Sequence, residues 1–293
     1  MCFPTISSFF VTNISRIMEA LHTLIENHYH TPGLLEDITK RLEEQEVDMD
    51  HVYRGHIAGV DEFHVRGAKV SRELANEAGL LGSSVLDVGC GLGGPSRMLA
   101  AEYCCNVTGI DLSHEYIRTA KGLSELVGLH DKTEYIQSNA LDLPFEKGSF
   151  DAVWTQHVQM NIRNKSKFYA EIERVLRSRG WFIYYDILST DSGEISYPVP
   201  WANDASVSFL GTGKDMNNTL ERIGFERILT NDQTKKGIHF LKGLFEKLKI
   251  NGPPPLGLNV LMGTSTKTKL VNILNGLVEE KIVLQSGIYK KVA

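Results

Sequence analysis

Residues 85–95, Val-Leu-Asp-Val-Gly-Cys-Gly-Leu-Gly-Gly-Pro, join a short apolar run directly to a cluster of glycines. The apolar run predicts a strand, and we expect a helix to begin at about Pro95. Glycine has no Cβ and tolerates positive φ, so the backbone can turn sharply here and approach a nucleotide-like ligand. Gly89, Gly91 and Gly94 also satisfy the GxGxxG pattern of dinucleotide sites. This stretch therefore predicts a ligand-binding turn between a strand and a helix of an α/β fold.

The rest of the chain alternates between strand-like and helix-like segments. Several short apolar runs lack clean alternation, as expected for strands of a parallel sheet that helices cover on both faces. We expect strands at 84–88, 106–110, 133–137, 150–156, 181–186, 227–231 and 282–290, and helices at 95–103, 114–127, 165–176, 212–223, 237–248 and 267–280. The pattern indicates a Rossmann-like, doubly wound α/β sheet.

The segments before and within this core have other patterns. Helical spacing predicts helices at 17–25, 34–46 and 69–79, so we expect residues 18–68 to form a helical lid and residues 69–293 the core. Residues 188–210 lose periodicity and contain Tyr197-Pro198-Val199-Pro200-Trp201, which excludes a helix or a central strand. We expect them to cap the carboxyl edge of the sheet. Residues 1–17 contain no acid and are either a disordered leader, which we favour, or an organelle-targeting segment.

Composition excludes several classes of function. The 293 residues are 42% hydrophobic and 23% charged, with a net charge of -5 and no dense Lys/Arg stripe, so we expect no nucleic-acid partner. No apolar run approaches the roughly 20 residues of a membrane span, so we expect no membrane partner. The four cysteines form no CxxC pair, which suits a reducing, cytoplasmic compartment. Tyr29 lies between two histidines, but no further ligands follow at useful spacing, so we expect no metal.

Two carboxylates distinguish between the ligands that such a glycine turn serves. Asp87 lies two residues before Gly89, where a carboxylate would gain nothing beside a pyrophosphate but would complement a cation. Asp111 follows the second strand, 20 residues after Gly91, where an acid can bind both ribose hydroxyls. Asp111 could instead cap the next helix, although Ser113 serves that role equally well. Both classes of ligand would use Asp111, so it is Asp87 that favours S-adenosylmethionine, which carries a sulfonium and an ammonium, over NAD(P).

Five blocks of sequence, in order, resemble the class I S-adenosylmethionine-dependent methyltransferase family. They are Asp87-Val88-Gly89-Cys90-Gly91, Gly109-Ile110-Asp111, residues 139–145 (Asn-Ala-Leu-Asp-Leu-Pro-Phe), residues 149–153 (Ser-Phe-Asp-Ala-Val) and Arg174-Val175-Leu176. The set is similar to the small-molecule branch that includes sterol, ubiquinone-precursor and sarcosine/dimethylglycine methyltransferases. One departure argues against a sterol substrate, because Asp111-Leu112-Ser113 replaces the asparagine-rich segment of sterol enzymes.

The resemblance implies a strand order, a cofactor and further cofactor contacts. The family has a seven-stranded sheet of order 3-2-1-4-5-7-6 with an antiparallel seventh strand, a role for which residues 282–290 are a candidate. It implies S-adenosylmethionine as the cofactor. Asn139 and Ala140 would then lie beside the adenine and Leu112 would pack on it, while Gln156 and His157 would lie near the methionine end.

Methyl transfer is an in-line displacement that chiefly requires alignment of the reacting groups and exclusion of water. His157 follows the fourth strand at the carboxyl edge of the sheet, so it is our candidate base; orienting the cofactor or capping the next helix are its alternatives. His64 and Arg66 occupy a segment that forms a flap over the cofactor in relatives, and they either reach a carboxylate there or are solvated. Tyr29 lies where the family often has an aromatic lid.

The acceptor is the least constrained part of the prediction. Tyr185 and Asp186 end the fifth strand and Trp201 follows in the cap, so an acid and aromatic faces could surround a cationic amine. This slightly favours an N-acceptor of the glycine, sarcosine or dimethylglycine type over an O-acceptor, although Trp201 could equally fill the core. A C-methyltransferase of a quinone or sterol-like precursor is the alternative. An NAD(P)-dependent oxidoreductase and a non-catalytic cofactor-binding protein are alternatives of other classes, and we expect a monomer or homodimer.

Overall fold

The computed structural model describes residues 20–26, 28–29 and 31–293. The predicted leader, residues 1–17, lies outside the described residues. Residues 20–26 and 28–29 are helical, so the helix expected at 17–25 is present over its described part. None of the helices in the described ranges is both long and apolar enough to cross a membrane.

In the described part of the chain, seven strands form one sheet of order β3-β2-β1-β4-β5-β7-β6. The strands are β1 (Ser84–Val88), β2 (Asn106–Asp111), β3 (Thr133–Gln137), β4 (Phe150–Gln156), β5 (Leu176–Ser189), β6 (Phe225–Asp232) and β7 (Ile282–Lys291). Strands β1 to β5 pair in parallel, whereas β7 runs antiparallel to β5 and β6. The predicted strand order is confirmed, and the last strand is the antiparallel one.

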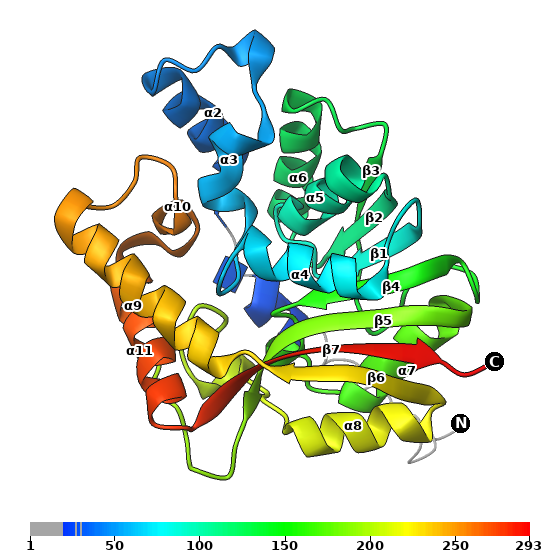
Figure 1. Cartoon of the computed structure of the whole chain (residues 1–293). Helices are drawn as coiled ribbons and strands as arrows, with labels where there is room; N and C mark the ends of the chain where they lie inside the picture. The colour runs from blue at the N-terminus through cyan, green and yellow to red at the C-terminus, as the bar shows by residue number, and fades with distance from the viewer. Residues whose placement is uncertain (1–19, 27, 30) are drawn as a thin grey trace, which may run out of the picture.

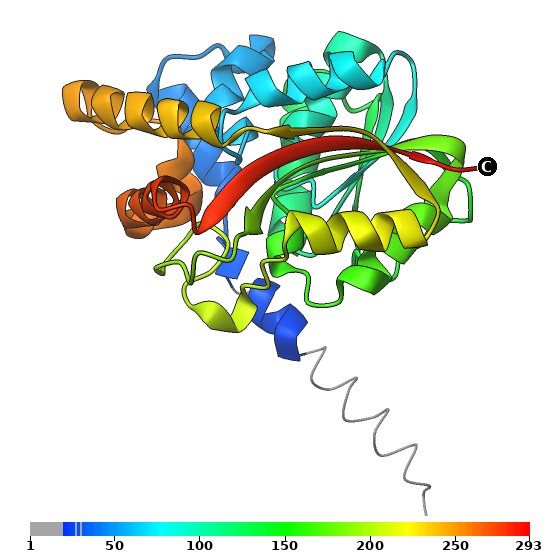
Figure 2. The ribbon, with the colours of Figure 1, turned by 60° about the horizontal axis from the view of Figure 1, so that its bottom comes forward.

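Helices cover both faces of this sheet (Figure 1, Figure 2). They are α2 (Leu34–Glu44), α3 (Arg54–Asp61), α4 (Ala68–Ala78), α5 (Gly94–Tyr103), α6 (His114–Leu126), α7 (Lys165–Val175), α8 (Gly213–Arg222), α9 (Thr234–Asn251), α10 (Leu258–Met262) and α11 (Thr266–Val278), with 3-10 turns at Met49–His51, Gln159–Asn161, Ala205–Val207 and Gly263–Ser265. One apolar core packs α4 and α5 on the sheet, and a second packs α7 and α8 on the opposite face. The doubly wound architecture is therefore confirmed.

Three elements differ from the sequence-based expectation. The short helix α3 was not expected, because its eight residues bury only Ile57, Val60 and Asp61 and give little periodic signal. Strand β5 begins at Leu176, directly after α7, so residues 177–180 belong to it although the sequence places them between a helix and a strand; Arg179 among them has a positive φ of 61°. Helix α10 forms only a few residues after the three prolines at 253–255, which predict a break and conceal the short helix that follows.

The chain leaves the sheet between β6 and β7, although these two strands pair with each other and a short hairpin turn would connect them. Residues 233–281, called here the β6–β7 insertion, contain α9, α10 and α11, which lie together at one end of the sheet (Figure 1, Figure 2). Asn272 of α11 donates a hydrogen bond of 2.8 Å to the Pro198 carbonyl oxygen in the cap. The close approach of Leu256 to α3 requires Gly59, since a Cβ there would lie 2.2 Å from the Leu256 carbonyl oxygen. The described residues of 18–68, called here the lid, and residues 188–210, called here the cap, thus lie with the insertion at the same end of the sheet (Figure 1).

Candidate active site

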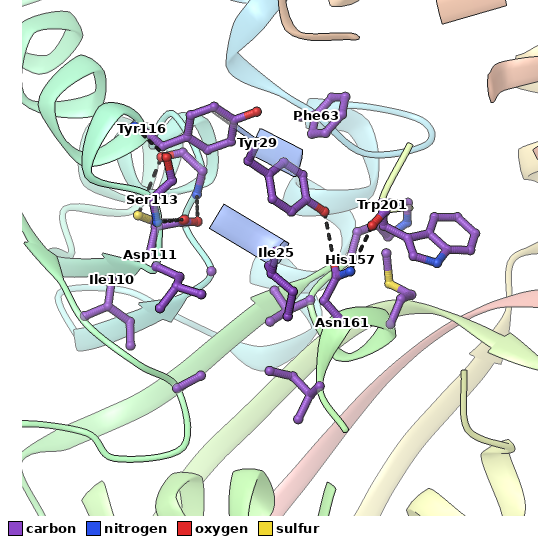
Figure 3. A pocket seen from close by; sticks show the side chains of 18 of the residues that line it. Ile25, Tyr29, Phe63, Ile110, Asp111, Ser113, Tyr116, His157, Asn161 and Trp201 are labelled. Atoms are coloured by element: carbon purple, nitrogen blue, oxygen red, sulfur yellow. Dashed lines mark hydrogen bonds between the residues drawn. The ribbon is translucent and has the colours of Figure 1, made fainter. Parts of the chain in front are cut away.

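A cavity of about 170 Å³ lies at the carboxyl ends of β1, β2 and β4, below the lid (Figure 3). Every residue that the sequence predicted to contact the cofactor lines it: Asp87, Gly89, Gly91, Asp111, Leu112, Asn139, Ala140, Gln156 and His64. His157, Tyr29 and Trp201 line it as well, whereas Tyr185 and Asp186 do not. The structure therefore brings together the predicted site residues other than Tyr185, Asp186 and Arg66.

The glycine turn between β1 and α5 needs its glycines for two physical reasons. Gly89, Gly91 and Gly93 have φ values of 72°, 55° and 82°, which side chains with a Cβ rarely adopt. A Cβ on Gly89 would also lie 2.5 Å from Val158 Cγ2, on the loop after β4. At Gly91 a Cβ would meet no protein atom within 4 Å, so the backbone here faces open space in the cavity wall. The turn is shaped to let a ligand approach its backbone.

A buried ion pair that the sequence did not reveal anchors the lid on this turn. Arg97 of α5 is fully buried and pairs with Asp61 at the end of α3, and its guanidinium also donates to the carbonyl oxygens of Leu92 and Ala120. A Cβ on Gly94 would lie 1.7 Å from the Asp61 carbonyl oxygen, so this glycine admits the lid. The pair fixes the position of Asp61, which lines the cavity.

Asp87 presents a buried carboxyl group near the end of β1. Its side chain is 2% exposed and accepts a hydrogen bond of 2.6 Å from Ser96 Oγ. Burial raises the pKa of Asp87 to about 7. The hydrogen bond from Ser96 opposes this rise, whereas the negative charge of the neighbouring Asp111 adds to it. A cation placed beside this group would relieve the cost of its burial. The arrangement therefore suits a positively charged ligand.

Asp111 ends β2, and its two carboxyl oxygens point along the cavity wall (Figure 3). One accepts from the Gly91 amide at 3.1 Å and the other from the Ser113 amide at 2.9 Å. Ser113, and not Asp111, caps α6, because its Oγ accepts from the Tyr116 amide. Asp111 is thus free of a capping role and holds the glycine turn against β2, with unused lone pairs on its carboxyl oxygens.

Gln156 and His64 belong to one buried polar cluster at the opposite wall. Gln156 Oε1 accepts from Trp154 Nε1 at 2.9 Å and from Ser71 Oγ at 3.2 Å, and its Nε2 lies 3.3 Å from His64 Nε2. His64 Nε2 also lies 3.1 Å from the Gly67 carbonyl oxygen and 3.3 Å from Glu62 Oε2. Burial lowers the pKa of His64 to about 4 and raises the pKa of Glu62 to about 8. His64 is therefore a neutral imidazole at neutral pH.

Arg66, which was grouped with His64, lies elsewhere. It is buried, donates to Gln233 Oε1 at 3.1 Å and pairs with Glu73 Oε1 at 2.7 Å. Because Gln233 precedes α9, this arginine ties the start of the β6–β7 insertion to α4. It is neither solvated nor part of the cavity wall, in contrast to both interpretations of the sequence.

His157 occupies the junction between β4 and the loop that follows it. It has a φ of 54°, its amide donates to the Tyr185 carbonyl oxygen at 2.8 Å, and its ring lies 5.0 Å from the Tyr185 ring and 6.0 Å from the His64 ring. Its Nε2 is buried and has no hydrogen-bond partner among the described residues. Burial, with a smaller contribution from His64, lowers the pKa of His157 well below its usual value. It presents a neutral ring at the cavity wall.

Tyr29 and Trp201 meet through one asparagine. Tyr29 Oη donates to Asn161 Oδ1, and Asn161 Nδ2 donates to the Trp201 carbonyl oxygen at 2.9 Å and to the Val207 carbonyl oxygen at 2.8 Å (Figure 3). The Trp201 indole is 1% exposed and donates to Ser208 Oγ. Trp201 thus both fills the core under the cap and lines the cavity, so the two alternatives for it are not exclusive.

Tyr185 and Asp186 lie behind the cavity wall. Asp186 is 1% exposed, and its carboxyl group accepts from the Val158 amide at 2.9 Å. It therefore positions the loop whose Val158 side chain packs on Gly89, instead of facing a ligand. Tyr185 is fully buried beneath His64 and His157. The sequence predicted that Tyr185 and Asp186 contact an acceptor only because they were expected at the end of a strand. Neither side chain lines the cavity, so this prediction is wrong.

Comparison with known proteins agrees with the geometry of this site. Residues 86–184 match the family model described as "Methyltransferase domain". Residues 86–184 are thus similar to methyltransferase domains. The match begins in β1 and ends in β5, so the methyltransferase domain includes the glycine turn, Asp111, Asn139 and the end of β4.

Curated relatives of the methyltransferase domain differ in the atom that they methylate. A sarcosine/dimethylglycine N-methyltransferase of Halorhodospira halochloris is 31% identical over 169 residues, which cover 58% of this chain and 59% of that protein. A sterol 24-C-methyltransferase of Gibberella zeae is 36% identical over 125 residues, which cover 42% of this chain and 33% of that protein. The matches thus span from about one third to three fifths of the length of these relatives.

A solved structure supports the fold over almost the whole chain. Geranyl diphosphate C-methyltransferase of Streptomyces coelicolor A3(2), crystallised with Mg²⁺, geranyl-S-thiolodiphosphate and S-adenosyl-L-homocysteine, superposes with a TM-score of 0.69. The superposition covers 93% of this chain and 98% of that one at 15% sequence identity, so it establishes a shared fold.

Proposed function

We propose that this protein transfers a methyl group from S-adenosylmethionine to a small-molecule acceptor. The observation that carries the proposal is the convergence of all nine predicted cofactor residues on one cavity, which holds the buried Asp87 carboxyl group and the partly buried Asp111 carboxyl group. A nicotinamide dinucleotide fits this cavity less well, because its pyrophosphate would approach the Asp87 carboxyl group through the glycine turn.

The residues present fit S-adenosylmethionine, which when bound supplies a methyl group on a positively charged sulfur. In our proposal Asp87 complements its positive charge, and Asp111 accepts hydrogen bonds from the ribose hydroxyls. Leu112, Asn139 and Ala140 line the cavity beyond Asp111 and would border the adenine. Gln156 and His64 close the opposite wall, where the amide and imidazole groups would orient the methionine end.

The chain's own part in the reaction is to align the acceptor, exclude water and accept a proton where the acceptor carries one. Lid, cap and β6–β7 insertion cover the cavity end at which His157 and Trp201 lie. His157 is neutral at neutral pH because burial lowers its pKa well below the usual value, so it can accept a proton there. We propose it as the base, with Tyr29 and Trp201 shaping the acceptor's place.

We assign the acceptor to the class of small molecules. Chemical analysis of the methylated product identifies the atom that receives the methyl group. The sequence slightly favours an amine of the glycine, sarcosine or dimethylglycine type. The Asp186 carboxyl group was expected to complement such an amine, but it accepts a hydrogen bond from the Val158 amide. Asp186 therefore does not support the preference for an amine acceptor. The relatives named above include both N- and C-methyltransferases.

Methyl transfer from isotopically labelled S-adenosylmethionine into a metabolite extract tests the proposal and isolates the acceptor together. We expect one labelled product with the wild-type protein and none with Asp111→Ala, whose cofactor affinity should fall by at least about 100-fold by calorimetry. Asp131→Ala, on an exposed loop, is the matched control. Binding of NADH in place of S-adenosylmethionine, followed by fluorescence, would refute the proposal.

A further inference from the structure

A second, apolar cavity adjoins the one described above. Its volume is about 30 Å³, and it shares Phe63, His64, His157, Pro200 and Ile273 with the first cavity. The two spaces therefore meet at the histidine pair, where His157 Nε2 is buried without a hydrogen-bond partner among the described residues.

The far wall of this space belongs to the β6–β7 insertion. The side chains that line it there are Phe240, Leu241, Leu244, Leu258, Met262 and Leu270. Its lining contains no charged residue, and of its polar side chains, His64 and His157, neither carries a charge at neutral pH, because burial lowers the pKa of both. A space with such apolar walls favours a hydrocarbon group over water.

The insertion is held in place over the methyltransferase domain by contacts at three points. Arg66 donates to Gln233 at its start, Asn272 donates to Pro198 of the cap, and Gly59 admits Leu256 onto the lid. Because β6 and β7 pair directly, the sheet does not need the insertion for its connectivity. Its helices instead supply most of the apolar wall beside His157.

We propose that the methyl acceptor carries a hydrocarbon group that occupies this second cavity, so that the acceptor is an amphipathic or apolar small molecule and not a free amino acid. This rests on the proposed function and names its acceptor class. The hydrocarbon group packs between α9, α10 and α11, and the atom to be methylated then lies beside the histidine pair, at the mouth of the first cavity. The insertion thereby selects the acceptor.

Binding of straight-chain alcohols, from butanol to decanol, tests this without requiring turnover. The full-length protein is incubated with the neutral fluorophore N-phenyl-1-naphthylamine, and displacement by each alcohol is measured. We expect affinity to rise about fourfold per methylene and then to level off when the space is filled. Leu244→Trp fills the space and should move this plateau to a shorter alcohol by about one methylene, because a space of about 30 Å³ holds little more than one such group. Leu248→Trp, one turn along α9 and outside the lining, should leave the plateau where it is.

Thermal unfolding of each variant establishes that it is folded. If Leu244→Trp does not fold, Phe240→Asp serves instead, because this side chain is 38% exposed and lines the same space. An affinity that is independent of chain length, or equal plateaus in the cavity variant and in Leu248→Trp, would overturn the acceptor class. Failure of S-adenosylmethionine to bind in the calorimeter overturns the proposed function instead, so the two failures are distinguishable.

Discussion

Tyr29 Oη donates a hydrogen bond of 2.9 Å to Asn161 Oδ1, and this bond joins the lid to the loop after β4 (Figure 3). Asn161 continues the connection to the cap through the Trp201 and Val207 carbonyl oxygens. The Tyr29 ring also packs against Tyr116 of α6, with ring centroids 5.7 Å apart. One tyrosine therefore fixes the lid with respect to both ends of the cavity.

Tyr29→Phe should loosen closure of the lid over the acceptor. Loss of a buried hydrogen bond, with Asn161 Oδ1 left unpaired, costs about 1–2 kcal/mol, so we expect the KM for the acceptor to rise roughly 5- to 30-fold. The calorimetric affinity for S-adenosylmethionine should change less. Tyr53→Phe, at a 62% exposed position in the lid, is the control. An unchanged KM would show that this bond plays no part in acceptor binding.

Asp87→Asn should make the ligand-free protein more stable at high pH. Burial raises the pKa of Asp87 from 3.8 to about 7, so the folded state binds this proton more tightly than the unfolded state. Stability from this group is present below about pH 4 and is lost as the pH rises through 7. The Tm advantage of the variant should therefore widen by roughly 5 °C between pH 5 and pH 8. Calorimetric scans of both proteins measure it, with Asp131→Asn as the control, and a constant difference would contradict it.

Asp61→Ala should destabilise the protein strongly, because it leaves the Arg97 guanidinium buried without its carboxylate. We expect a loss of about 3–5 kcal/mol in the free energy of unfolding, measured by urea denaturation. Glu44→Ala removes the exposed pair with Lys40, whose side chains are 72% (Lys40) and 62% (Glu44) exposed, and should cost less than about 0.5 kcal/mol. Replacing both Asp61 by Leu and Arg97 by Met should recover part of the loss. Equal effects of Asp61→Ala and Glu44→Ala would refute the role of the buried pair.

His157→Gln should lower kcat by roughly 100-fold if His157 is the base, with little change in KM. The pKa of His64 is lowered to about 4 and that of His157 well below its usual value, so kcat should stay level as the pH falls from about 8 through about 6.5. His51→Gln, an 82% exposed position, is the control for histidine loss. A decrease in kcat near pH 6.5, or a loss of less than about threefold in the variant, would assign His157 to orientation of the ligands.

The sheet and the cofactor side of the site could be predicted from the sequence because they depend on local signals. A glycine turn has few alternative uses, and the carboxyl ends of parallel strands meet at one edge, so Asp87, Asp111 and Asn139 had to lie close together. Arg97 and Asp61 gave no such signal, since charged residues are usually exposed and the two lie in different helices. Asp186 was expected to end a strand, but β5 continues to Ser189, and the Val158 amide holds the Asp186 carboxyl group away from the cavity.

The pairing of β6 with β7 makes the segment between them replaceable. Both strands keep their hydrogen bonds to each other whatever helices the chain forms between them, so a different set of helices can be exchanged there provided that it still covers the apolar core that Leu241, Leu270 and Leu277 share with the sheet. Acceptor preference can then diverge during evolution, or be redesigned, by changes to one continuous stretch of sequence, while the chemistry at the glycine turn is inherited intact.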